Sequence, residues 1–455
     1  MRVSDLATVS FRSRGVRRAA LLAAATALLL LLAHWLVPDD AWRSLRAPDR
    51  PPTHGAPLSY DEALSRVDGL TAGAQELARA RGGEWLVQER LANLLIERAR
   101  LTGSFDDYAA AQQALDRAFA AAPAGSGPHM TQAALAFGLH RLGQAEAALN
   151  AIDHYAVRAE AEMRAEAWAT HGDIAFYRGQ YAEALRRYQH PAVEGETGDA
   201  VRLAVYLGKT GHVDEALKSL NRAQREMRFP TAQGLANLDL QRGALELQRG
   251  AYDRAAADFA LADKVFPGWW LTQAHRAQML ALAGRRAEAI RQFEAIAARN
   301  PAPEVMDALA GLYRAEGDFP HSKLWSDRAG AAWQTRLQQI PEAAWGHAIE
   351  HELAFGSPAR ALDLAQKDYA ARPYGAAAIA LGWAYIANNR PAEALAAVDK
   401  VTASPWVSAD QHIVAAQAHA LLGQSDAADA EQQKALAINP HSLDRDAALI
   451  WFGHS

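Results

Sequence analysis

Cysteine is absent from the 455 residues of this chain. Its absence excludes disulfide bonds, thiolate metal sites and cysteine nucleophiles, and it is compatible with an oxidising compartment. Long runs of lysine or arginine are also absent, and the formal net charge is −5. Because surfaces that bind nucleic acid are usually basic, we expect no nucleic-acid partner.

The composition is that of a folded protein, with 50% hydrophobic and 22% charged residues. A single compact domain rarely reaches this length, so the chain should contain either several domains or a repeat array that lengthens without one central core. The sequence has no G-x-S-x-G elbow, no dinucleotide-binding glycine pattern and no calcium loop. We therefore expect no cofactor and no resident metal.

Residues 19–37 form an apolar run that is interrupted only by Thr26 and His34. As a helix this run would be about 28 Å long, close to the roughly 30 Å of a bilayer core. Four arginines lie within residues 12–18, and such a cluster usually stays in the cytoplasm. The run therefore predicts one transmembrane helix, with the rest of the chain on the far side of the membrane.

A cleaved signal peptide is the alternative for this segment. The run exceeds the roughly 7–15 apolar residues of a signal peptide, and the residues that follow it, Pro38 to Asp40, are poor neighbours for cleavage. We therefore favour an uncleaved signal-anchor. Residues 1–18 would be a basic cytoplasmic N-terminus, and the proline-containing residues 38–59 an extended linker.

Small and aromatic residues recur downstream with a period near 34. The clearest copy contains Gly243, Gly250, Tyr252, Ala255, Phe259, Ala262 and Pro267. The next copy has residues of similar kinds, each displaced by 34 positions: Ala277, Gly284, Ala289, Phe293, Ile296 and Pro301. A fixed period of this length indicates a stack of supersecondary units, none of which buries its apolar face alone.

The pattern resembles the tetratricopeptide repeat (TPR), a pair of antiparallel helices that cross at small residues and often end at a proline. The resemblance implies an all-α fold, a right-handed α-solenoid of helix-turn-helix repeats. About ten repeats fit residues 84–442, with longer joins near 228–230 and 331–339. Residues 60–83 are expected to form a capping helix, and residues 443–455 a C-terminal cap.

Proteins of this family usually bind peptides or partner domains on the concave side, which the first helix of each pair lines. Carrying the family's groove positions onto this frame gives the candidate binding residues Phe137, His140, Asp173, Phe176, Tyr177, Trp383 and Ile386. Rigid aromatic rings supply contact area at a small entropic cost, but rings at helical spacing are more often core. The family's carboxylate clamp is not expected, since only Arg202 and Lys209 are basic at the corresponding positions.

A possible enzyme motif is H-x-x-E-H at His347, Glu350 and His351, the pattern of inverted zinc peptidases. Trp345 fits the tryptophan position of a repeat, so the motif falls on an ordinary first helix, and we expect no enzyme. Gly208 to Thr210 looks like the end of a phosphate-binding loop, but Leu203 stands where that loop needs a glycine.

The abundance of alanine and arginine fits a GC-rich bacterial genome. The sequence therefore predicts a scaffold or adaptor that binds proteins or peptides in the cell envelope, single-pass in the inner membrane, with a periplasmic repeat domain. The alternatives are the same scaffold facing the cytoplasm as an assembly adaptor, and, more remotely, a zinc-dependent hydrolase.

Overall fold

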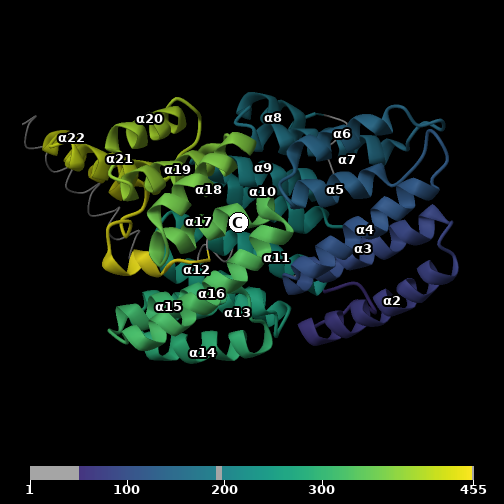
Figure 1. The fold of residues 1–455 in the computed structure, drawn as a ribbon, viewed down its shortest axis with the longest axis horizontal. Helices are drawn as coiled ribbons and strands as arrows, with labels where there is room; N and C mark the ends of the chain where they lie inside the picture. The colour runs from purple at the N-terminus through teal and green to yellow at the C-terminus, as the bar shows by residue number, and fades with distance from the viewer. Residues whose placement is uncertain (1–50, 191–196, 453–455) are drawn as a thin grey trace, which may run out of the picture. The chain divides into compact units, whose positions relative to one another are not determined.

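In a computed structural model, the described residues are 51–190 and 197–452. Their regular structure is entirely helical, with 21 α-helices (α2 to α22) and one short 3-10 helix, η2 (Figure 1). The prediction of an all-α fold is confirmed. The predicted anchor at 19–37 lies outside the described residues, and within them no helix combines the length and the apolar character that crossing a membrane requires.

The helix α2 (Tyr60–Ala80) precedes ten antiparallel helical pairs. The first helices of the pairs are α3 (Trp85–Thr102), α5 (His129–Gly138), α7 (Ala161–Tyr177), α9 (Thr197–Lys209), α11 (Ala232–Gln248), α13 (Trp270–Leu282), α15 (Pro303–Ala315), α17 (Pro341–Ala354), α19 (Gly375–Ala387) and α21 (Ala409–Leu421). The second helices are α4 (Phe105–Ala121), α6 (Leu142–Ile152), α8 (Tyr181–Tyr188), α10 (Val213–Glu226), α12 (Tyr252–Val265), α14 (Arg286–Arg299), α16 (Phe319–Gln339), α18 (Pro358–Ala371), α20 (Pro391–Thr402) and α22 (Ser425–Ile438).

Small residues allow the two helices of a pair to approach closely. A Cβ atom added to Gly243 on α11 would overlap the ring of Phe259 on α12, and that ring is fully buried. Ala255 and Ala262, on the same side of α12 as Phe259, are also fully buried. The recurring small and aromatic residues therefore mark the contacts within and between pairs, which gives a TPR-like packing of helix-turn-helix units.

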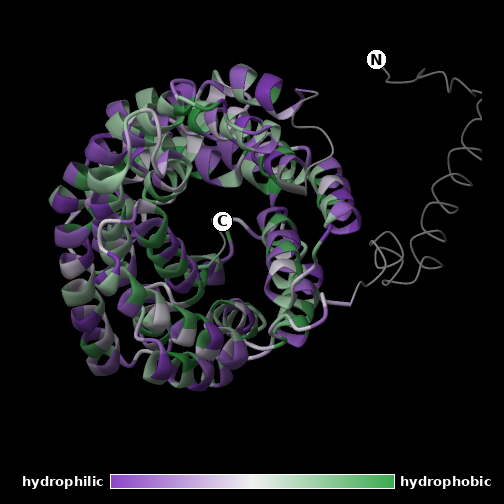
Figure 2. Cartoon of the chain, turned by 90° about the vertical axis from the view of Figure 1, so that its right-hand side faces the viewer, coloured by the Kyte–Doolittle hydropathy of each residue, from purple (hydrophilic) through white to green (hydrophobic). Residues whose placement is uncertain are grey.

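Successive turns of the solenoid contact each other directly. In each of the first five pairs, the short loop that joins the two helices contacts a connection between pairs in the second half of the chain. This connection follows the pair that comes five pairs later. The contacts join Thr102 to Asn300, Arg141 to Glu342, Tyr181 to Gly375, Lys209 to Val407, and Tyr252 to His441. One turn therefore takes between five and six pairs, which wind around a common axis (Figure 2).

The long spacing near 331–339 is an extension of a helix and not a longer join. The helix α16 continues to Gln339, whose Nε2 donates a hydrogen bond to Asp106 Oδ1 at 2.7 Å. The guanidinium of Arg336 lies 4.5 Å from the ring centroid of Phe105. Because Phe105 and Asp106 begin α4, this extension fastens the second turn of the solenoid to its first pair.

Both ends of the described part are attached to distant repeats. Near the start, the backbone N–H of Thr53 donates to the carbonyl of Pro230 at 2.7 Å. After α22, the chain forms η2 (Arg445–Leu449) and packs against α13 and α15. The described part of the predicted C-terminal cap therefore lies against the sixth and seventh pairs.

Candidate functional site

The first helices of the pairs line the inside of the solenoid. Neighbouring first helices contact each other at α3–α5, α5–α7, α7–α9, α13–α15, α17–α19 and α19–α21. In a curved stack, the helices that approach one another lie on the inside of the curve. We call the accessible faces of these first helices the inner surface.

Four of the predicted binding residues form one aromatic group at the ends of α5 and α7. The ring of Tyr177 lies 5.6 Å from Phe137, 5.8 Å from His140 and 5.7 Å from Phe176. His140 has a φ of 61° in the turn after α5, the position where most pairs have glycine. Burial lowers the pKa of His140 to about 3, so its imidazole is neutral at ordinary pH.

This aromatic group is a contact between two turns of the solenoid. Tyr374 lies 4.9 Å from Tyr177, and Trp406 lies 6.1 Å from Phe176. Both come from connections in the second turn, so no local sequence pattern could have identified them. Phe176 is only 4% exposed, which means that it can affect a partner mainly by shaping the surface around it.

The other predicted residues lie close by but have different surroundings. Trp383 and Ile386 on α19 are partly buried and pack against the same hydrophobic cluster as Tyr177. Asp173 on α7 accepts hydrogen bonds from the Tyr188 hydroxyl at 3.0 Å and from Arg202 Nε at 2.9 Å. Whether any of the seven residues touches a partner stays a prediction.

Burial has a large effect on the Asp173 carboxyl. It raises the pKa of Asp173 to about 6, although the charge and hydrogen bond of Arg202 and the hydroxyl of Tyr188 act in the opposite direction. Glu166 shares Arg202 through a 2.5 Å ion pair, and its negative charge adds to the upward shift. Because the effect of burial on the pKa exceeds that of the largely buried ion pair, the Asp173 carboxyl makes stability depend on pH.

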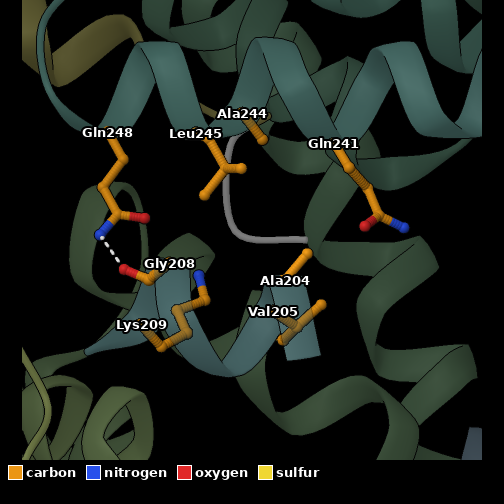
Figure 3. Close-up of a pocket in the computed structure, with 8 residues that line it drawn as sticks. All are labelled: Ala204, Val205, Gly208, Lys209, Gln241, Ala244, Leu245 and Gln248. Atoms are coloured by element: carbon orange, nitrogen blue, oxygen red, sulfur yellow. Dashed lines mark hydrogen bonds between the residues drawn. The ribbon is translucent and has the colours of Figure 1, made fainter. Parts of the chain in front are cut away.

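A small pocket lies on the inner surface between α9 and α11 (Figure 3). Its cavity volume is about 30 Å³, and it is lined by Ala204, Val205, Gly208, Lys209, Gln241, Ala244, Leu245 and Gln248. At one end the helices touch, because Gln248 Nε2 donates to the carbonyl of Gly208 at 3.2 Å. The pocket is therefore a bounded depression with mostly apolar walls.

Lys209 gives this pocket its positive charge. Its side chain and that of Gln241 reach into the space between the helices (Figure 3). Burial lowers the pKa of Lys209, and the charge of Asp410 acts in the opposite direction. An ammonium group beside an apolar wall suits a ligand that presents an apolar group next to a carboxylate or carbonyl.

The H-x-x-E-H residues are on α17, the first helix of a pair, as the position of Trp345 predicts. His351 Nδ1 is hydrogen-bonded to Asp307 Oδ1 at 2.7 Å, whereas His347 Nδ1 lies 3.2 Å from Glu350 Oε2. Among the described residues, no group of three or more His, Asp or Glu side chains could hold a metal ion.

Comparison with known proteins found similarity in solved structures but not among family models or curated proteins. No family model matches the chain, and no curated protein matches it. It is similar to the crystal structure of a tetratricopeptide repeat protein from Parabacteroides merdae ATCC 43184, with 14% sequence identity and a TM-score of 0.34. That match covers 56% of this chain and 96% of the other.

The described residues thus define a TPR-like helical-repeat protein of ten pairs. The evidence for this class is the paired packing of the chain's own helices and the repeated small residues at their crossings. Helical repeats of this kind act generally as surfaces for protein partners.

Proposed function

We propose that this protein is a membrane-anchored scaffold or adaptor that binds protein or peptide partners on its inner surface, in the cell envelope of a bacterium. The observation that carries the proposal is the pocket between α9 and α11, where Lys209 and Gln241 stand beside apolar residues of two neighbouring first helices. A small pocket on a surface built from successive first helices suits one side chain of an extended polypeptide better than a separate small molecule.

The proposed location depends on the amino-terminal sequence. The apolar run at 19–37 and the arginines before it support a single-pass anchor in the inner membrane, with the repeats in the periplasm. A fusion of alkaline phosphatase after residue 455 tests the orientation, since this enzyme is active only where its disulfides form. Activity of a cytoplasmic reporter alone at the same site would favour the alternative, an assembly adaptor that faces the cytoplasm.

Site-specific crosslinking in living cells tests the binding surface. A photo-crosslinking residue at Gln241 lies in the pocket, and one at the exposed Lys218 on α10 is the matched control on a second helix. We expect discrete crosslinked partners from position 241 and none from position 218. The crosslinks from position 241 should weaken in a Lys209→Ala variant. Equal patterns from both positions would contradict the proposed inner-surface binding.

A further inference from the structure

The C-terminal segment, residues 443–452, occupies part of the inner surface. After α22 the gold-coloured chain in Figure 1 turns back, and η2 contacts α13 and α15, which are both first helices. Leu449, Trp451 and Phe452 are at most 9% exposed and belong to the hydrophobic cluster of these helices. Ile450 has φ −83° and ψ 101°, so the chain here is extended.

One side chain of α13 holds the backbone of this segment. Gln278 Oε1 accepts hydrogen bonds from the backbone N–H groups of Trp451 and Phe452, each at 2.7 Å. Gln278 Nε2 donates to the carbonyl of Phe452 at 2.5 Å. Gln278 is fully buried, and all three bonds are to main-chain atoms that any peptide presents. Such a clamp recognises an extended peptide and leaves sequence selection to the neighbouring pockets.

The two aromatic rings of the segment fill those neighbouring pockets. Trp451 stacks on Phe355, which follows α17, with centroids 5.8 Å apart, and its indole Nε1 lies 3.0 Å from the position a Cβ would have on Gly311. Phe452 stacks on Phe293 at 6.0 Å. Aromatic residues in closed pockets usually supply most of the binding energy of a peptide.

A separate contact anchors the segment upstream of the rings. Arg286 donates to Asp446 Oδ1 at 2.6 Å and to Glu316 Oε1 at 3.0 Å. Asp446 is outside the ring pockets and is only partly buried, whereas Asp444 is more exposed and bonds to His441, which precedes the segment. The anchor can therefore be weakened without changing the surface that holds the rings.

We propose that the surface formed by α13, α15 and the end of α17 binds an extended apolar peptide with two consecutive aromatic residues from a partner protein, and that the C-terminal segment occupies this site until the partner displaces it. This inference rests on the proposed function and specifies its partner chemistry. The segment mimics the ligand: its backbone satisfies Gln278, and its rings fill pockets on three consecutive pairs of the repeat array.

A synthetic peptide of residues 447–455 (AALIWFGHS) serves as the probe, with the full-length protein as receptor. In the wild-type chain the attached segment competes with the probe, so only the open fraction of the protein binds it. Asp446→Arg places a positive charge beside Arg286 and should tighten probe binding about five- to tenfold, measured by fluorescence anisotropy. Asp444→Arg is the matched control and should bind like the wild type.

Three further results decide the proposal. A probe with alanine in place of both aromatic residues should not bind, and Gln278→Leu in the Asp446→Arg background should weaken binding. Equal binding of the alanine probe, or no gain in the Asp446→Arg chain, overturns the proposal. A swapped dimer of that chain, detected by light scattering, also overturns it, because the occupant would then be a second copy.

Hydrogen exchange on the wild-type chain gives a test that needs no variant. A saturating unlabelled probe should accelerate exchange at the backbone N–H groups of Trp451 and Phe452 of the isotope-labelled protein, and leave exchange in α11 unchanged. No acceleration would overturn the proposal. Crosslinks from Gln241 without probe binding would contradict this inference alone, whereas probe binding without any captured partner would contradict the proposed function.

Discussion

The hydroxyl of Tyr181 accepts a hydrogen bond of 2.8 Å from the backbone N–H of Gly375, a residue 194 positions later in the chain. Tyr181 begins α8, in the third pair, and Gly375 begins α19, in the ninth. The bond is one of the contacts that join the loops inside the first five pairs to the connections between later pairs. A solenoid usually depends on nearest-neighbour contacts alone, so these bonds should make distant pairs unfold together.

The Tyr181→Phe substitution should reduce the free energy of unfolding by about 1–2 kcal/mol, because it leaves the buried N–H of Gly375 without its acceptor. Tyr313→Phe is the matched control. The hydroxyl of Tyr313 bonds to Glu294 in an exposed position, and its loss should cost less than about 0.5 kcal/mol. Urea unfolding monitored by circular dichroism measures both. Equal effects would mean that the two turns do not meet at Tyr181.

The Gly179→Ala substitution should destabilise the protein more than Gly284→Ala. Both glycines have positive φ, 71° and 76°, so alanine costs about 1 kcal/mol of backbone strain at either position. Only at Gly179 does the added Cβ also come within 2.6 Å of the carbonyl oxygen of Pro373 in the next turn, whereas nothing lies within 4 Å at Gly284. We expect the free energy of unfolding of Gly179→Ala to be lower than that of Gly284→Ala by at least about 1 kcal/mol. Thermal unfolding of the two variants measures this difference.

Asp173 should make stability fall as the pH rises from about 4 to 6. Its pKa in the folded chain is about 6, above the 3.8 of an unperturbed Asp, so the unfolded chain releases this proton first. The contribution of Asp173 is therefore full below pH 4 and is lost as the pH rises through 6, a change of about 2–3 kcal/mol. Relative to Asp173→Asn, which cannot ionise, the wild type should lose most of this amount between about pH 4 and 6 and the remainder by about pH 7. Parallel pH curves for the two proteins would contradict the burial of this charge.

The His351→Ala substitution should lower stability without changing metal content. His351 is 6% exposed and bonds to Asp307, a carboxylate that is 1% exposed and also accepts from Trp333 Nε1 at 2.7 Å. Loss of the imidazole leaves this carboxylate under-bonded, at a cost of about 2 kcal/mol. His347→Ala, at a side chain that is 42% exposed, should cost much less. Stoichiometric zinc in the purified wild type that disappears in His347→Ala would support the hydrolase alternative instead.

The helical pairs could be predicted from the sequence because their contacts are local. Gly243 and Phe259 are 16 positions apart, and contacts with the same spacing join Gly172 to Tyr188 and Gly382 to Val398. The period, the all-α class and the position of His347 to His351 on a first helix all follow from this pattern. Each depends on residues within a single repeat or its neighbour.

The contacts between turns could not be predicted in the same way. Tyr374 contacts Tyr177, and Trp406 contacts Phe176, because each pair is rotated slightly relative to the one before it and these rotations add up over five pairs. The sequence of a single repeat does not determine the total rotation. The position of the C-terminal segment could not be predicted from the sequence either. Its apolar residues predict burial, but the three backbone bonds to Gln278 depend on where the last pair releases the chain.

Crosslinking between Asp106 and Gln339 tests the central claim, that one turn of the solenoid packs directly on the next. These side chains are joined by a 2.7 Å hydrogen bond across 233 positions, and the chain has no cysteine that could interfere. The double variant Asp106→Cys, Gln339→Cys should form an intramolecular crosslink with a short bismaleimide, detected by mass spectrometry, whereas Asp106→Cys paired with Lys434→Cys on α22 should not. Failure of the first pair to crosslink in a folded, monomeric chain would contradict the account.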